Sequence, residues 1–164
     1  MAKILFTSGS TGQPKGVINT QRMMCANQES AAAAWLFLTD HPPVIVDWLP
    51  WNHTFGGNHN FNMMLRNGGT LYIDEGKPVP ALIGRTVANL REVSPTVYFN
   101  VPRGYAALLD HLEKDEALRQ KFFARLDLLF LCGRRPAAEP VGSPGGAGAA
   151  GARAARCRSS PPGA

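Results

Sequence analysis

Apolar residues occur in short unbroken runs, separated by polar and amphipathic stretches, over the first 131 residues of the chain. Such a run is typical of a strand that is buried on both faces, because both sets of alternate side chains then pack against the interior. We therefore predict strands at residues 4–6, 44–49, 70–73, 96–99 and 127–131, with a short extended segment at 17–18.

Between these runs, apolar residues return at helical spacing. Leu108 and Leu112 fall on one face of one segment, and Leu118 and Phe122 on one face of the next. Proline and glycine pairs interrupt the pattern and end the segments before them. We predict helices at 20–38, 60–67 and 82–93, and two more before residue 126. The alternation of strands with helices favours an α/β fold with a mainly parallel sheet flanked by helices.

Ligands of parallel sheets bind beyond the carboxyl ends of the strands. Three segments with unusual composition follow predicted strands: 7–16, 50–57 and 100–105. We expect them to meet at one edge of the sheet and to form one site.

The first of these segments has the composition of a phosphate-binding loop. Its glycines allow close backbone approach, so that successive N–H groups can turn toward an anion, while its hydroxyls and one lysine add further donors. The candidate phosphate-binding residues are Thr7, Ser8, Gly9, Ser10, Thr11, Gly12 and Lys15. A Ser/Gly-rich surface turn is the alternative, but it does not explain Pro14-Lys15-Gly16 at this spacing.

The loop is not the P-loop of common kinases and hydrolases, in which the lysine is followed by Ser or Thr. Here Gly16 follows Lys15. The ten residues 7–16 instead resemble the signature loop of the adenylate-forming superfamily, which includes acyl-CoA and aryl-CoA synthetases, luciferases and peptide-synthetase adenylation domains. This resemblance implies a partial N-terminal-type subdomain of such an enzyme.

The second segment, 49–56, resembles another motif of the same superfamily. By itself, a histidine beside Trp51 and Phe55 is more often a packed, hydrogen-bonded residue than a functional one. The resemblance implies that this histidine helps to form the pocket for the carboxylic acid substrate. The acyl-pocket candidates are His53, Phe55, Gly56 and Asn100.

No metal site is expected from the sequence. Asp47, Asp74 and Glu75 lack a suitably placed second carboxylate, and residues 74–78 are better explained as a turn after a strand. His41, His59 and His111 are interpreted as structural residues.

Residues 3–130 resemble the feruloyl-CoA synthetase branch in three stretches, at 17–20, 48–58 and 98–105. The resemblance implies a parent enzyme that activates a hydroxycinnamate, a small aromatic carboxylic acid, with ATP and Mg²⁺. The acyl-adenylate would then transfer its acyl group to coenzyme A. The superfamily's later motifs, which bind adenine, ribose and metal, do not occur in this sequence. We expect no catalytic set to be complete here and no ligase activity from this chain alone.

The composition changes at Gly133. From there to Ala164, 26 of 32 residues are Gly, Ala, Arg or Pro, too few apolar residues to offset the entropy of ordering. We predict a partial AMP-binding domain over 1–132 and a disordered tail over 133–164. The tail has five Arg and one Glu, so it supplies +4 of the net charge of +5. It could bind polyanions, but no aromatic residue is interleaved to stack bases, so no nucleic-acid partner is expected.

The tail departs from the superfamily pattern at Leu131, where an Ala/Gly-rich turn ending in Leu-Pro is usual. Removing one nucleotide at the Phe130/Leu131 junction gives a family-like reading if GC-rich codons are assumed. We therefore hypothesise a frameshift. The three cysteines have no ligand spacing, and neither a targeting signal nor an apolar stretch long enough to cross a membrane is evident. We expect a cytoplasmic location.

Overall fold

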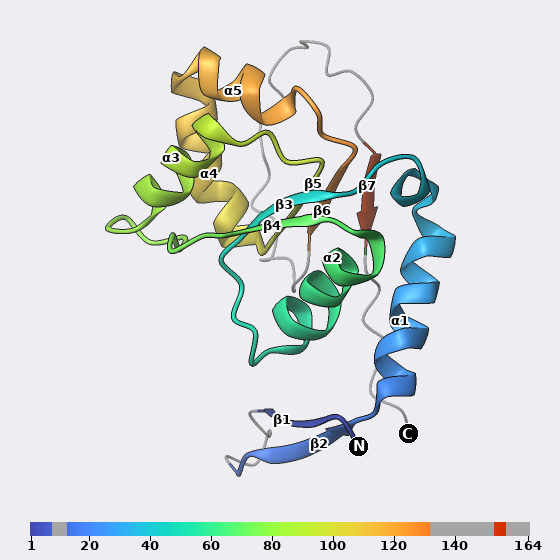
Figure 1. Ribbon diagram of the computed structural model, residues 1–164. Coiled ribbons are helices and arrows are strands. Elements are labelled where there is room, and N and C mark those ends of the chain that lie inside the picture. The colour runs from blue at the N-terminus through green and yellow to red at the C-terminus, as the bar shows by residue number, and fades with distance from the viewer. Residues whose placement is uncertain (8–12, 132–152, 157–164) are drawn as a thin grey trace.

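A computed structural model describes residues 1–7, 13–131 and 153–156. The α/β class is confirmed: within these residues, short parallel strands form a layer with helices on both faces, and a separate hairpin lies below it in Figure 1.

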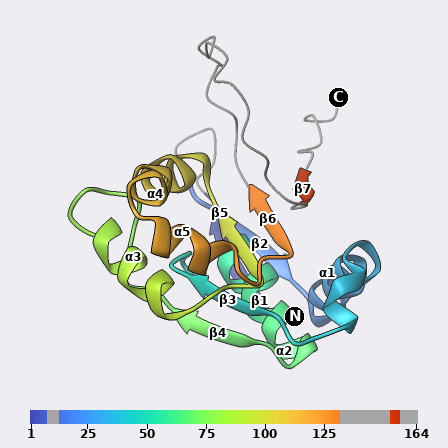
Figure 2. The same ribbon diagram turned by 90° about the horizontal axis from the view of Figure 1, so that it is seen from above.

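The parallel strands form two small sheets that lie next to each other. Strand β3 (Val44–Asp47) pairs with β4 (Thr70–Ile73), and β5 (Val97–Asn100) pairs with β6 (Leu128–Leu131). The Thr96 N–H donates to the Val44 carbonyl oxygen, and the Val44 N–H donates to Thr96 Oγ1, both at 2.9 Å. These bonds hold β3 beside β5, so β4, β3, β5 and β6 run side by side (Figure 2).

The strands are buried on both faces, as their apolar runs predict. Alternate side chains enter two different apolar clusters: Ile45 and Phe99 face one, whereas Val46 and Tyr98 face the other. The first cluster is covered by the 3-10 turn Leu36–Thr39, the π-helix η2 (Thr54–Phe61) and α2 (Asn62–Asn67), and α1 (Gln21–Ala34) packs against these elements. The second is covered by α3 (Ile83–Glu92), α4 (Pro102–Lys114) and α5 (Glu116–Phe123).

Local signals in the sequence set several helix ends. The Thr20 hydroxyl accepts from the Met23 N–H at the start of α1, and the Asp115 carboxylate accepts from the Leu118 N–H at the start of α5. Gly68 ends α2 with a φ of 63°, a conformation that glycine adopts without steric cost. The sequence predicts that this helix ends at residue 38, but α1 ends at Ala34 and the chain continues as a 3-10 turn.

The strand at the amino end does not belong to the parallel sheet. Strand β1 (Lys3–Thr7) pairs antiparallel with β2 (Lys15–Asn19), with Ile4 opposite Ile18. The expectation that the glycine-rich loop follows a strand of the parallel sheet is therefore wrong. The physical reason is length: residues 8–14 are enough to close a hairpin, whereas a parallel return needs a crossover of about a dozen residues or more.

The disordered-tail prediction for 133–164 lies largely outside the described residues. Within it, the described residues Arg153–Arg156 form β7, which pairs in parallel with β6. Strand pairing uses backbone groups, and the open edge of β6 offers them whatever the side chains are. Within the described part of the chain, no helix is long and apolar enough to cross a membrane.

Candidate functional site

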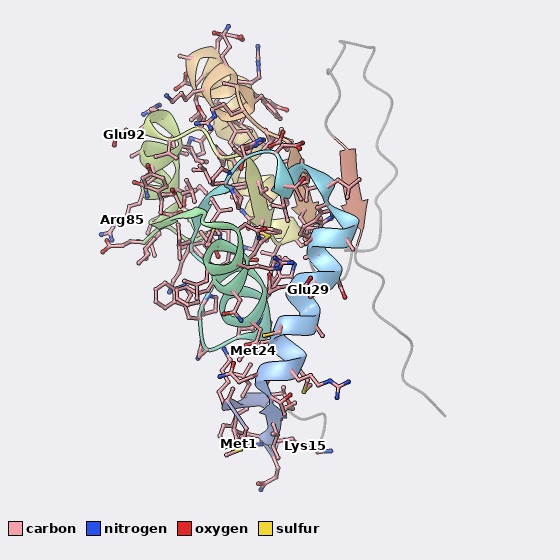
Figure 3. The ribbon with its side chains drawn as sticks, turned by 45° about the vertical axis from the view of Figure 1, so that its right-hand side comes forward. Met1, Lys15, Met24, Glu29, Arg85 and Glu92 are labelled. Carbon is pink, nitrogen blue, oxygen red and sulfur yellow. The ribbon has the colours of Figure 1, made fainter. Side chains whose placement is uncertain are left out.

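The hairpin carries two of the predicted phosphate-binding residues, Thr7 and Lys15. Thr7 and Lys15 form its last pair, and the Thr7 hydroxyl donates to the Lys15 carbonyl oxygen at 3.4 Å. Both side chains are exposed, and Figure 3 shows Lys15 at the end of the molecule opposite the helices of the second cluster. The candidates Ser8, Gly9, Ser10, Thr11 and Gly12 lie outside the described residues.

The base of the hairpin is attached to η2 by buried amide side chains. Asn58 Nδ2 donates to Asn19 Oδ1 at 2.8 Å, and both residues are buried. From α1, Gln28 Nε2 donates to the carbonyl oxygen of Asn58 at 3.0 Å. The hairpin therefore has a fixed attachment to the element that carries the second predicted motif.

That motif forms the start of η2. His53 is its exposed N-cap, and the Phe55 N–H donates to His53 Nδ1 at 3.3 Å. Gly56 is buried, and a Cβ there would lie 2.6 Å from the Pro50 carbonyl oxygen and 2.8 Å from that of Leu49. Only glycine lets the helix pack this closely on the preceding turn. A π-helix is uncommon and frequently marks a functional site.

Phe55 joins an aromatic group at the carboxyl ends of β5 and β6. Its ring centroid lies 5.7 Å from Phe99, 5.6 Å from His59 and 6.0 Å from Phe130. Trp35 packs edge-on against His59 and Phe130 from the other side. Burial lowers the pKa of His59, which favours the neutral form of the ring. Together these rings form an aromatic wall along the first apolar cluster.

Asn100 lies at the end of β5 and is buried. Its Nδ2 donates to the Tyr98 hydroxyl at 3.2 Å, and its Oδ1 accepts from the Val101 N–H at 2.9 Å. A Cβ on Gly104 would overlap the Asn100 side chain, so this glycine makes room for it. The Tyr105 hydroxyl bonds the carbonyl oxygens of Tyr98 and Phe130 at 2.8 and 3.0 Å, which ties α4 to both strands.

The predicted site is thus brought together in part. Phe55, Gly56 and Asn100 belong to elements that pack at one edge of the sheet, with His53 exposed at the entry to η2. The hairpin of β1 and β2 lies apart from that edge, below α2 in Figure 1, and Figure 3 shows Lys15 at that end of the molecule.

The carboxylates at the strand ends are used by the protein itself. Asp47 accepts from the Leu49 N–H and from Asn60 Nδ2, and burial raises its pKa. Asp74 accepts from the Gly76 N–H, the Thr86 hydroxyl and Asn89 Nδ2, as in the predicted turn. Among residues 1–7, 13–131 and 153–156, no three His, Cys, Asp or Glu side chains are grouped as metal ligands. The Asp47 and Asp74 carboxylates do not fit a resident Mg²⁺, because hydrogen bonds within the protein already occupy their oxygens.

The amide contacts around η2 were not among the contacts predicted from the sequence. Asn58 and Asn60 bond other elements through their side chains, and Asn62 Nδ2 donates to the Asn58 carbonyl oxygen. Asparagine at every second position inside an otherwise buried segment is the signal that could have revealed them, because buried polar groups need partners.

Comparison with solved structures places this fold in a class of proteins. A malonyl-CoA ligase in a ternary product complex with methylmalonyl-CoA and AMP matches with a TM-score of 0.63 and 26% identity, over 78% of this chain and 26% of that one. The o-succinylbenzoate CoA synthetase of Bacillus subtilis, in complex with an acyl-adenylate, matches with a TM-score of 0.58 and 21% identity, over 81% and 31%. The fold is that of part of the N-terminal region of adenylate-forming enzymes.

Sequence comparison gives the same result. The sequence model of the AMP-binding enzyme family matches residues 1–143, and the chain belongs to this family. It is 29% identical over 124 residues to the long-chain-fatty-acid–CoA ligase ACSBG2 of Gallus gallus, covering 72% of this chain and 16% of the relative. A second relative is the 3-[(3aS,4S,7aS)-7a-methyl-1,5-dioxo-octahydro-1H-inden-4-yl]propanoyl:CoA ligase of Rhodococcus jostii. It is 27% identical over 114 residues, which cover 70% of this chain and 21% of the relative. The chain thus spans about a fifth of the length of these curated relatives or less.

Proposed function

We propose that this chain is a portion of an ATP-dependent carboxylate–CoA ligase, that it binds the phosphates of ATP through its hairpin, and that it does not catalyse the ligation alone. The observation that carries the proposal is the glycine-rich hairpin, closed by Thr7 and Lys15, within a chain of the AMP-binding enzyme family. The chain covers 16% of the length of the ACSBG2 relative, which supports the proposals that it is a portion of a ligase and does not catalyse the ligation alone.

In the parent reaction, a carboxylate oxygen attacks the α-phosphorus of ATP and the bond to the β-phosphate oxygen breaks, which gives an acyl-adenylate and pyrophosphate. The thiol of coenzyme A then displaces AMP from the acyl carbon. The ammonium group of Lys15 and the loop donors Thr7 to Gly12 would hold the β- and γ-phosphates and so stabilise the charge of the leaving pyrophosphate.

The acyl substrate that we propose is a hydroxycinnamate such as ferulate. His53, Phe55, Gly56 and Asn100 would line its pocket. The aromatic wall of Phe55, His59 and Phe130 supports a flat aromatic substrate, because aromatic rings pack well edge-to-face or offset. Trp35 contacts this wall, so the tryptophan fluorescence of the chain can report binding. Ferulate should change the emission saturably, and palmitate and malonate should not; equal responses to all three would contradict the assignment.

Calorimetric titration of the full chain tests the phosphate-binding proposal. ATP should bind and AMP should bind much more weakly, because AMP lacks the β- and γ-phosphates. Lys15→Ala should weaken ATP binding roughly tenfold to a hundredfold, since a hydrogen bond to a charged group contributes about 1.5–3 kcal/mol. The matched control is Lys77→Ala, which removes the same charge from another exposed lysine. Absence of saturable ATP binding by the unmodified chain would refute the proposal.

A second assay tests the lack of catalysis. With ATP, Mg²⁺, coenzyme A and ferulate, the chain should release no pyrophosphate above the protein-free background. Without groups that hold adenine and ribose, the α-phosphorus is not positioned for attack, and positioning supplies much of the rate. Ferulate-dependent pyrophosphate release would show that the chain is a complete catalyst.

We also propose that a frameshift at the Phe130/Leu131 junction produced the tail. The change in composition at Gly133 supports the frameshift. The match to the family model extends beyond the proposed junction, to residue 143. The nucleotide sequence of the gene decides the question. The shifted frame should stay open and encode an adenine-binding motif downstream; an early stop codon or the lack of that motif would exclude a frameshift.

A further inference from the structure

A buried network of amide side chains joins the hairpin to the π-helix η2. Asn19 is the last residue of β2, and its Oδ1 accepts from Asn58 Nδ2 at 2.8 Å. Asn19 Nδ2 donates back to the Val17 carbonyl oxygen at 2.9 Å, which fixes the orientation of its amide. One side chain thus connects the backbone of β2 with the middle of η2.

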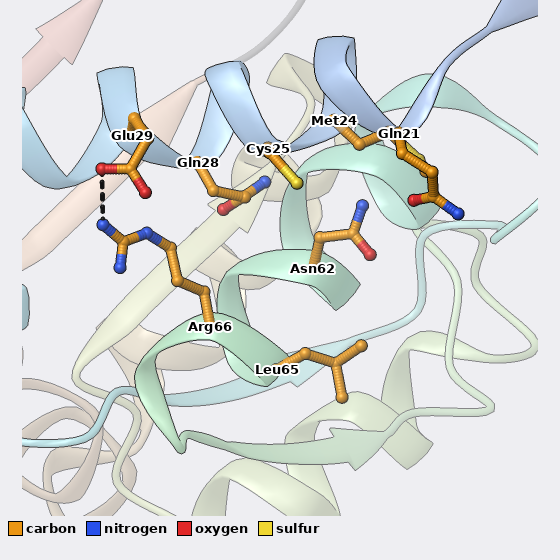
Figure 4. Close-up of a pocket in the computed structure, with 8 residues that line it drawn as sticks. All are labelled: Gln21, Met24, Cys25, Gln28, Glu29, Asn62, Leu65 and Arg66. Atoms are coloured by element: carbon orange, nitrogen blue, oxygen red, sulfur yellow. Dashed lines mark hydrogen bonds and ion pairs between the residues drawn. The ribbon is translucent and has the colours of Figure 1, made fainter. Parts of the chain in front are cut away.

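Helix α1 supports the same contact from behind. Gln28 Nε2 donates to the carbonyl oxygens of Asn58 and His59, at 3.0 and 3.3 Å. Figure 4 shows Gln28 in the groove between α1 and α2, across from Asn62 and beside the ion pair of Glu29 with Arg66. Asn62 Nδ2 donates to the Asn58 carbonyl oxygen as well, at 3.0 Å. The backbone of Asn58 is therefore held from two helices.

The two described strands of the hairpin have few other attachments to the rest of the described chain. Residues 15–18 of β2 are exposed and Asn19 alone is buried in that strand, while Leu5 is the buried residue of β1. The Lys3 side chain passes close to Gly57, which gives a second contact with η2. A hairpin with so little apolar burial depends on directional bonds to keep its position, because two strands alone are marginally stable.

The network is poorly designed for stability alone. Within the described residues, Gln28 Oε1 and Asn58 Oδ1 are buried without a hydrogen-bond donor. Buried acceptors without a donor destabilise a protein, and an apolar replacement of both partners can be neutral or stabilising. Hydrogen bonds between amides fix the relative orientation of the groups that they join, which apolar contacts do not do.

We propose that Asn19 and Asn58 are positioning residues that hold the phosphate-binding hairpin in a fixed orientation against η2, the element that carries Phe55 and Gly56. The nucleotide-binding and acyl-binding parts of the chain are then presented as one unit. This inference rests on the proposed function for its ligand, but the position of the hairpin can be tested without any ligand.

The test compares two substitutions at Asn19. Asn19→Leu has a similar size but no acceptor for Asn58 Nδ2, whereas Asn19→Asp keeps an acceptor oxygen. Hydrogen exchange of the Leu5 and Val17 amides reports on the hairpin, and exchange of the Phe99 and Phe130 amides reports on the parallel sheet. Asn19→Leu should accelerate hairpin exchange about tenfold and leave the sheet unchanged. Asn19→Asp keeps the bond from Asn58 but loses the bond to the Val17 carbonyl oxygen, so it should accelerate hairpin exchange less than Asn19→Leu does.

ATP affinity is the second readout. Asn19→Leu should weaken ATP binding about tenfold and Asn19→Asp should weaken it less, because the aspartate keeps the bond from Asn58 Nδ2. If Asn19→Leu does not fold, Asn58→Ser breaks the same bond without introducing an apolar side chain and carries the same expectations. Failure of the unmodified chain to bind ATP would refute the proposed function and leave the exchange test intact. Unchanged hairpin exchange, or equal acceleration of hairpin and sheet, would overturn the positioning role.

Discussion

Asn60 Nδ2 donates a 2.8 Å hydrogen bond to Oδ2 of Asp47, and both side chains are buried. Asp47 ends β3 and Asn60 lies in the second half of η2, so the bond links the carboxyl end of the parallel sheet with the helix that carries Phe55 and Gly56. The other oxygen of Asp47 accepts from the Leu49 N–H. A single carboxylate thus fixes both the turn before η2 and η2 itself.

This carboxylate should make stability depend on pH. Burial raises the pKa of Asp47 above 3.8, against the opposing effect of its bonds with Asn60 and Leu49. The folded state then holds the proton more tightly than the unfolded state, so the stabilising contribution is complete below pH 3.8 and is lost as pH rises through the folded pKa. In urea unfolding from pH 3 to 8, Asp47→Asn should remove this decrease.

The control for this experiment is Asp110→Asn, which removes a carboxylate from an exposed position on α4. It should leave the slope of stability against pH over the same range close to that of the unmodified chain. The loss of one hydrogen bond in Asp47→Asn shifts its whole curve by a constant, which does not affect the comparison of slopes. Parallel curves for the unmodified chain and Asp47→Asn would contradict the prediction.

Gly56 and Gly84 should respond in opposite ways to alanine. At Gly56 the new Cβ would lie within 2.8 Å of two backbone oxygens, and backbone cannot move aside cheaply. We expect Gly56→Ala to destabilise the fold by about 1–3 kcal/mol, as overpacking does. At Gly84, on α3, no atom lies within 4 Å of a new Cβ, so Gly84→Ala should stabilise by about 0.4–1 kcal/mol. Chemical unfolding at one pH measures both, and a neutral Gly56→Ala would show that η2 can shift.

The strands were predictable because their physics is local to the sequence. Val97, Tyr98 and Phe99 form an unbroken apolar run, and the structure buries alternate members in separate clusters on the two faces. Helix starts such as Thr20 and ends such as Gly68 were also marked by residues with a specific backbone or hydrogen-bonding preference.

The π-helix and the hairpin were not predictable in the same way. The residues 54–61 contain two glycines and two asparagines, which by themselves favour a turn. Their helical form depends on partners distant in sequence, since Asn58 bonds Asn19 and Asn60 bonds Asp47. For the candidate site, the sequence identified the segments, but the separation of the hairpin tip from the sheet edge follows from antiparallel pairing, which composition does not reveal.

One face of the hairpin should promote association between molecules. Directly opposed residues of paired strands share a face, so Ile4, Ile18 and Phe6 lie together, with exposures of 45%, 57% and 72%. An exposed apolar face on a two-stranded sheet favours pairing with another chain. The double variant Phe6→Ser/Ile18→Thr should lower concentration-dependent light scattering. Leu109→Ser, at an exposed leucine on α4, should not, and an equal effect of both would indicate a general response to lost apolar surface.

Asp115 should act on pH dependence in the opposite direction to Asp47. Its carboxylate caps α5 through the Leu118 N–H at 2.9 Å and pairs with Arg91 of α3 at 2.8 Å, and these two contacts lower its pKa. A group with a lowered folded pKa stabilises the fold above its unfolded value of 3.8, and that stabilisation is lost as pH falls through the folded pKa. Asp115→Asn keeps an acceptor for the cap but removes the charge, so the unmodified chain should be the more stable at pH 7, and the difference should shrink on acidification to pH 2. Arg103→Gln, at an exposed arginine on α4, is the control for the loss of a charge. If the difference in stability between the unmodified chain and Asp115→Asn persisted at pH 2, the charge of Asp115 would not be what joins α3 to α5.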